Sequence, residues 1–195
     1  SRGHSFAGHE INMYGEPEKR AENAGEMSLG GLSDLGLDAG GVRPKPFYFI
    51  VAFWGKEHRN YFLELCLPSL LSPNNIPALE DKEHSRVVIV TTKGDWRMVR
   101  RHPTFALMER HIKADPIFVP RPLFRQRKKM LFMSKCQKLA AEKAFEDKAL
   151  GVYLAPDVIL SDGSVRTLQR LAMDGWKAVL CAVVRFSSEG SLPEI

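Results

Sequence analysis

Two carboxylates stand close together after an apolar run near the end of the chain. Residues 152–154 have the β-branched and apolar character of a buried parallel strand, and Asp157 follows where such a strand would end. Asp162 comes five positions later, just before a helical pattern. Ligands of open parallel sheets bind at the carboxyl ends of the strands, and carboxylates are good ligands for Mg²⁺ or Mn²⁺. We therefore expect Asp157 and Asp162 to share one rim with a divalent cation. The alternative is that Asp157 only ends a strand and Asp162 only caps a helix.

Two earlier apolar runs, 47–53 and 86–92, also end in polar or aromatic residues. If the sheet is parallel, these ends lie at the same edge as Asp157. The second run ends in groups that suit hydrogen bonding to a nucleotide base or ribose, namely hydroxyls, a lysine, a flexible glycine and a carboxylate. Alternatively, Lys93-Gly94-Asp95 is an ordinary polar turn, of which these residues are equally typical. The candidate binding residues at these two ends are Trp54, Gly55, Thr91, Lys93 and Asp95.

The densest positive stretch spans residues 121–135. This stretch fits a solvated helix start equally well, although cations at the start of a helix oppose the helix dipole, which counts slightly in favour of an anionic partner. Two partners fit this stretch. One is the phosphates of a nucleotide, and the other is nucleic acid.

Several function classes lack their motifs. The chain has no GxxxxGK[ST] loop, no GxGxxG turn, no paired histidines and no GxSxG, which argues against P-loop enzymes, dinucleotide-dependent dehydrogenases, histidine metal centres and acyl hydrolases. No apolar segment is long enough to span a membrane, and the three cysteines lack metal or disulfide spacing. We therefore expect a cytoplasmic protein.

The 195 residues are 44% hydrophobic and 26% charged, which is ordinary for a globular domain. Residues 1–45 offer little apolar periodicity and indicate a flexible arm or linker, whereas residues 46–195 alternate short apolar runs with amphipathic stretches. Residues 42–195 carry a net charge of +9. The prediction is an α/β, Rossmann-like three-layer sandwich with a mostly parallel sheet of about five strands. Its strands are 47–53, 86–92, 117–119, one ending before Asp157, and 177–186, and its helices are 59–71, 104–111, 124–147 and 164–174.

With these elements, the chain resembles the nucleotide-binding half of nucleotide-sugar-dependent glycosyltransferases of the GT-A fold. The stretch Tyr153-Leu-Ala-Pro-Asp157-Val-Ile-Leu-Ser-Asp162 is similar to the strand end that carries the family's acidic motif, although Ala155-Pro156-Asp157 stands in place of Asp-x-Asp. The resemblance implies that Asp157 helps to bind Mn²⁺ or Mg²⁺ on the donor diphosphate, and that Asp95 and Thr91 face the base or ribose. It also implies that Arg125 or Lys129 assists the leaving group.

The predicted function is thus to bind a nucleoside diphosphate sugar for glycosyl transfer to an acceptor that the sequence does not identify. The chain ends soon after the fifth predicted strand, before the family's acceptor-binding half, so we expect a truncated domain without its catalytic base. The alternative is a non-enzymatic α/β module that binds nucleic acid or another anionic partner through residues 121–135.

Overall fold

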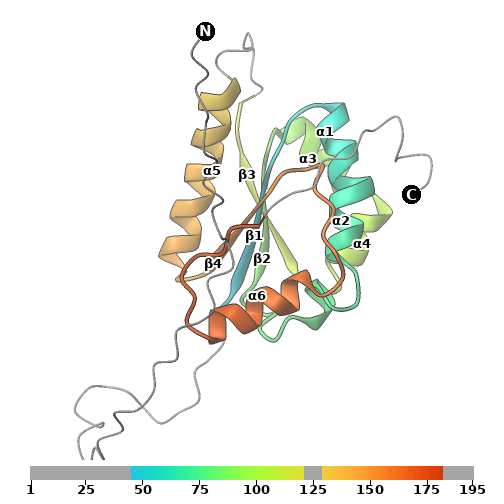
Figure 1. The fold of residues 1–195 in the computed structure, drawn as a ribbon. Helices are drawn as coiled ribbons and strands as arrows, with labels where there is room; N and C mark the ends of the chain where they lie inside the picture. Colours follow the sequence, from blue (N-terminus) through green and yellow to red (C-terminus); the bar gives the residue numbers. More distant parts are fainter. Residues whose placement is uncertain (1–44, 121–128, 182–195) are drawn as a thin grey trace, which may run out of the picture. The chain divides into compact units, whose positions relative to one another are not determined.

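The structure, a computed structural model, describes residues 45–120 and 129–181. In this part a parallel sheet carries helices on both faces (Figure 1). The sheet order is β3-β2-β1-β4, and every neighbouring pair is parallel. The α/β class and the parallel sheet are therefore confirmed. The strands are β1 (Phe47–Ala52), β2 (Arg86–Thr91), β3 (Lys113–Phe118) and β4 (Leu150–Leu154).

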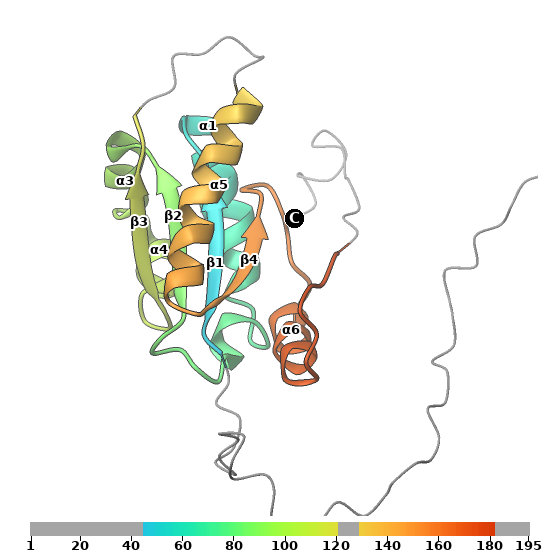
Figure 2. The ribbon, with the colours of Figure 1, turned by 90° about the vertical axis from the view of Figure 1, so that its left-hand side faces the viewer.

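Two hydrophobic cores lie on opposite faces of the sheet. β1 is buried along its whole length, and its side chains alternate between the two cores. Phe49 and Val51 belong to the larger core, which packs against the helices between β1 and β3. Ile50 and Ala52 belong to the smaller core, which is covered by α5 (Lys129–Glu146) (Figure 2). This layering is consistent with the Rossmann-like sandwich that the sequence predicts.

The predicted count of about five strands is wrong for the described part of the chain, which contains four. Residues 177–181 of the expected fifth strand 177–186 form no strand, and residues 182–186 lie outside the described part. Leu180 is 98% exposed and packs against neither core. An apolar run shows that a segment favours pairing or burial, but it does not show that a partner strand is present.

β3 is longer than the predicted strand 117–119. It begins at Lys113 and includes Pro116, and it ends at Phe118, two residues before Pro120. Proline removes a backbone donor and is tolerated at a sheet edge. β3 fits this rule because β2 is its only partner among the described strands.

The helix predicted over 59–71 forms as one continuous helical stretch that starts earlier. It consists of α1 (Lys56–Tyr61), the π-helical turn η2 (Phe62–Cys66) and α2 (Leu67–Leu70). A proline within a helix usually kinks or ends it, because the ring collides with the carbonyl one turn earlier, and Pro68 lies within this stretch. Instead the wider η2 turn lies directly before it, and the helix continues to Leu70. We attribute η2 to this accommodation of Pro68.

Two short helices follow β2. α4 (Pro103–Met108) matches the helix predicted over 104–111, and Pro103 lies in its first turn, where proline is well tolerated. α3 (Lys93–Val99) was not predicted, since Lys93-Gly94-Asp95 was interpreted as a turn. The η3 turn (Ile76–Ala78) lies in the loop before β2.

The remaining helices follow the prediction closely. α5 covers most of the helix predicted over 124–147, of which residues 124–128 lie outside the described part. α6 (Ser164–Met173) packs against the larger core through Val165, and the helix is followed by Gly175 at φ 86°. No helix of residues 45–120 and 129–181 has both the length and the apolar composition needed to cross a bilayer.

Candidate functional site

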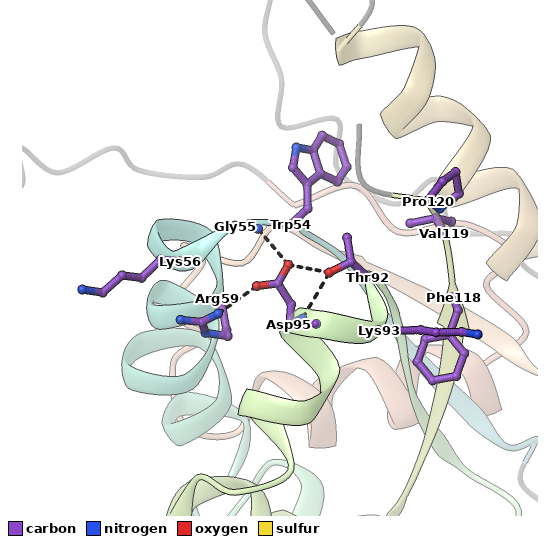
Figure 3. A pocket seen from close by; sticks show the side chains of 11 residues that line it. Trp54, Gly55, Lys56, Arg59, Thr92, Lys93, Asp95, Phe118, Val119 and Pro120 are labelled. Carbon is purple, nitrogen blue, oxygen red and sulfur yellow. Dashed lines mark hydrogen bonds and ion pairs between the residues drawn. The ribbon is translucent and has the colours of Figure 1, made fainter. Parts of the chain in front are cut away.

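A cleft opens where β1, β2 and β3 end, and we call it the strand-end cleft (Figure 3). Its volume is about 780 Å³. All three of its walls come from loops at the carboxyl ends of parallel strands, where open α/β sheets bind their ligands. The lining residues are Trp54, Gly55, Lys56 and Arg59 after β1, Thr92, Lys93, Gly94 and Asp95 after β2, and Phe118, Val119 and Pro120 at the end of β3.

Asp95 holds two of these walls together (Figure 3). Its Oδ2 accepts hydrogen bonds from the backbone N–H of Gly55 at 3.0 Å and from the Thr92 hydroxyl at 2.8 Å. Its Oδ1 accepts from Arg59 Nη1 at 2.8 Å in an ion pair. Asp95 is only 8% exposed, so the carboxylate is a buried link between the loop after β1 and the start of α3.

The local sequence explains why α3 starts at this point. Thr92 is the N-cap, and its hydroxyl accepts from the backbone N–H of Asp95 at 3.1 Å while donating to the Asp95 carboxylate. This pair differs from a capping box, because the carboxylate at N3 accepts from the hydroxyl of the N-cap residue and not from its backbone N–H. It turns a stretch that resembles a turn into the first turn of a helix.

Gly55 occupies a backbone conformation that other residues rarely adopt. Its φ is 87°, and no atom lies within 4 Å of the position that a Cβ would occupy. The glycine is therefore required by the backbone angle and not by crowding. Its N–H is already bound to Asp95, so the loop after β1 has a fixed conformation at the cleft.

The cleft carries surplus positive charge. Arg59 is paired with Asp95, while Lys56 and Lys93 are exposed and form no ion pair with any described residue. Two aromatic side chains complete the walls. Trp54 packs edge-on against Phe132 of α5 with ring centroids 5.0 Å apart, and Phe118 is 45% exposed.

Thr91 was predicted to face a base or ribose, but it does not line the cleft. Its side chain is fully buried at the end of β2, and its Oγ1 has no hydrogen-bond partner among the described residues. The next residue, Thr92, reaches the cleft instead. Successive side chains of a strand point to opposite faces, so a shift of one residue exchanges burial for access.

Asp162 lies away from the cleft. It accepts hydrogen bonds from the backbone N–H of Asn74 at 2.8 Å and from Asn74 Nδ2 at 2.7 Å, and these bonds lower the pKa of Asp162. Asn74 follows α2, whereas Gly55 precedes α1, and the fifteen helical residues between them span about 20 Å. Asp162 therefore lies near the amino-terminal edge of the sheet.

Asp157 does lie beyond the carboxyl end of a strand, three residues after β4, and it is exposed. Burial, followed by the negative charge of Asp157, raises the pKa of Cys66 in η2 to about 12. The expectation that Asp157 and Asp162 share one rim is thus wrong, because the connecting segment runs along α2 and is bound there by Ser69 and Asn75. No group of three or more His, Cys, Asp or Glu side chains in the described part is arranged to hold a metal.

The two predicted phosphate-binding residues, Arg125 and Lys129, are not among the residues that line the cleft. Lys129 is the exposed first residue of α5, three positions before the Phe132 that contacts Trp54. Arg125 lies outside the described residues, as does most of the 121–135 stretch on which the nucleic-acid alternative depends.

Sequence reasoning missed Arg59 and the third wall at Phe118, Val119 and Pro120. The signal for this wall was available: a third parallel strand must end at the same edge as the first two. Arg59 had no comparable signal, because its contact with Asp95 joins residues 36 positions apart.

The strand order places the cleft beside a reversal of the chain path. The connections from β1 to β3 carry their helices against the larger core, whereas α5, which precedes β4, packs on the opposite face. The direction of the sheet therefore changes between β1 and β4, which is where doubly wound sheets bind ligands. Trp54 and Asp157 follow the two strands on either side of this point.

The chain matches no protein-family model, no curated protein and no solved structure.

Proposed function

We propose that the strand-end cleft binds the nucleoside diphosphate part of an activated sugar, in a GT-A-like glycosyltransferase domain. The observation that carries the proposal is the cleft at the carboxyl ends of β1, β2 and β3, lined by Lys56 and Lys93, which form no ion pair with a described residue. The proposal does not specify which sugar, base or acceptor is used, and it assigns no catalytic residue.

The chemistry of the cleft suits such a ligand. Nucleotide sites combine apolar and aromatic surface with a few placed polar groups, and this cleft joins Trp54 and Phe118 to two lysines. The lysines supply point charges for phosphate oxygens. Asp95 acts here as a positioning residue, because its carboxylate is already occupied by Gly55, Thr92 and Arg59.

A divalent cation on the diphosphate would have Asp157 as its carboxylate ligand. Asp157 is exposed and follows the carboxyl end of β4, beside the switch point, although it is not among the residues that line the cleft. Mg²⁺ is commonly held by one or two carboxylates together with substrate phosphates and water, so one aspartate is compatible with binding in the presence of the nucleotide. The cation would then offset the charge of the departing diphosphate.

We also propose a cytoplasmic location. Cys66, Cys136 and Cys181 are free thiols, and Cys66 and Cys136 are buried. Free cysteines are typical of a reducing compartment.

The test is calorimetric titration of the full chain with UDP and GDP, each with and without Mn²⁺. We expect one nucleoside diphosphate to bind, and Mn²⁺ to tighten its binding. Lys56→Met should weaken binding by about tenfold, the usual effect of losing one hydrogen bond to a charged group. The matched control is Lys113→Met, which removes an exposed lysine at the opposite end of β3.

A folded chain is recognised by a cooperative thermal unfolding transition. If such a chain gives no heat of binding with either diphosphate, nucleotide binding is contradicted. An equal effect of Lys56→Met and Lys113→Met would instead contradict the assignment of the cleft. A separate assay, in which hydrolysis or transfer of a UDP- or GDP-sugar is followed, tests the transferase activity.

A further inference from the structure

A second hollow lies on the outer side of α3, between this helix and the edge strand β3. Its volume is about 690 Å³. It shares Lys93 and Phe118 with the strand-end cleft, but its other residues are its own. We call it the basic hollow and define it by Lys93, Trp96, Arg97, Arg100, Glu109 and Phe118.

The cations of the basic hollow form a row. Lys93 and Arg97 belong to α3, and Arg100 is its C-cap residue with a helical backbone conformation. The three are spaced four and three residues apart, so they lie on one face and extend over about 10 Å along the helix axis. All three are exposed, and none forms an ion pair with a described residue. Glu109 is the one carboxylate in the lining of this hollow, so positive charge exceeds negative charge there by two.

An aromatic surface lies beside this row. Trp96 is half-buried and is fixed by edge-on contacts with Phe105 at 5.4 Å and with Phe118 at 6.4 Å between ring centroids. Phe118 stands at the end of the edge strand β3 and is 45% exposed. The hollow thus offers a held, accessible ring next to three cations that form no ion pair with a described residue.

We propose that the basic hollow binds single-stranded nucleic acid. The row of cations is too long for one phosphate group, whereas successive phosphates of an extended strand are spaced to meet it. A charged groove with an aromatic ring for stacking is the combination by which proteins hold single strands without reading their sequence. An acidic peptide would match the charges but would leave the ring without a stacking partner. The proposal goes beyond the binding of a nucleoside diphosphate sugar and does not depend on it.

The test is fluorescence anisotropy of a labelled oligothymidylate of about ten nucleotides, a length within the usual site size, at several salt concentrations. We expect salt-sensitive binding by the full chain. The double variant Arg97→Gln/Arg100→Gln should weaken binding by about tenfold or more and reduce the slope of log K against log salt by about 1.4, since each lost phosphate contact on a single strand contributes about 0.7. Phe118→Leu should weaken binding by about fivefold through lost stacking.

The matched control is Arg166→Gln/Arg170→Gln, which removes two exposed arginines with helical spacing from α6. It should leave binding unchanged. Equal affinities for the two double variants would overturn the proposal, as would displacement of the oligonucleotide by a polyglutamate peptide at the same charge concentration. Arg97 and Arg100 do not line the strand-end cleft, so both double variants should bind UDP or GDP equally well. If neither diphosphate binds, only the proposed transferase function is contradicted, and the proposed binding of single strands is still tested by the oligonucleotide.

Discussion

The carboxylate of Asp95 accepts a hydrogen bond from the backbone N–H of Gly55, 40 residues earlier in the chain, at 3.0 Å. The same carboxylate accepts from the hydroxyl of Thr92, the N-cap of α3, and pairs with Arg59 of α1. One nearly buried side chain therefore determines the distance between two walls of the strand-end cleft. The cleft should be sensitive to this residue even if no ligand atom touches it.

Asp95→Asn should lower the free energy of unfolding by about 2 kcal/mol, because it leaves Arg59 without its partner and removes the charge that Gly55 and Thr92 donate to. Urea denaturation at neutral pH measures the change. Arg59→Met removes the other side of the pair, and the double variant should lose less than the sum of the two single variants. Additive losses would show that the pair contributes nothing to stability.

Thr91→Val should preserve or increase stability, by up to about 1 kcal/mol, because it replaces a buried hydroxyl that has no partner in the described part of the chain with a methyl group of similar size. Thermal unfolding and nucleotide titration of the same sample check both expectations. Nucleotide affinity should stay unchanged, since Thr91 does not line the cleft. Loss of affinity with intact stability would restore the role that the sequence analysis assigned to this hydroxyl.

The environment of Tyr48 leads us to expect that the free energy of unfolding falls at alkaline pH. Burial, followed by the hydrogen bond and the charge of Asp147, raises the pKa of Tyr48 to about 12. The unfolded chain releases this proton near pH 10, so the contribution of the protonated tyrosine is complete below pH 10 and is lost as the pH rises from about 10 to 12.

Tyr48→Phe should remove this part of the pH dependence. The free energy of unfolding should then fall less steeply between pH 10 and 12, and the change in its slope should correspond to at most one bound proton. Urea titrations at a series of pH values measure the slope. Cys66, whose pKa is also about 12, acts in the same direction and stays in both proteins, so it cancels in the comparison. Equal slopes would mean that Tyr48 ionises alike in the folded and unfolded chains.

The sequence predicts the fold best where local pattern and tertiary structure agree. β1 and β2 are continuous apolar runs because both faces of each strand are buried, and α6 is amphipathic and ends before a glycine at φ 86°. α3 was missed because Gly94 and Asp95 favour turns. The pattern Thr92-x-x-Asp95, in which the threonine hydroxyl caps the helix at Asp95, is present in the sequence, but the sequence analysis did not consider it.

The candidate site was only partly predictable for a different reason. Parallel strands must end at one edge, and this rule was enough to bring Trp54, Gly55, Lys93 and Asp95 to one cleft. It does not describe the path of the chain after β4. That path is determined by contacts with residues nearly ninety positions earlier, such as Asn74 with Asp162, which no local pattern encodes.

Asp162 and Asp157 should therefore respond differently to the same substitution. Asp162→Asn should leave any effect of Mn²⁺ on nucleotide binding unchanged and should weaken the attachment of the loop before α6, because the hydrogen bonds from Asn74 favour the charged carboxylate. The lowered pKa of Asp162 means that its contribution to stability is complete above the usual aspartate range near pH 4 and is lost as the pH falls below it. Asp157→Asn should abolish the effect of Mn²⁺ with little change in stability, since this side chain is exposed. Calorimetric titration with Mn²⁺ and acid denaturation of both variants separate the two roles, and a loss of the Mn²⁺ effect in Asp162→Asn alone would assign the metal to the other aspartate.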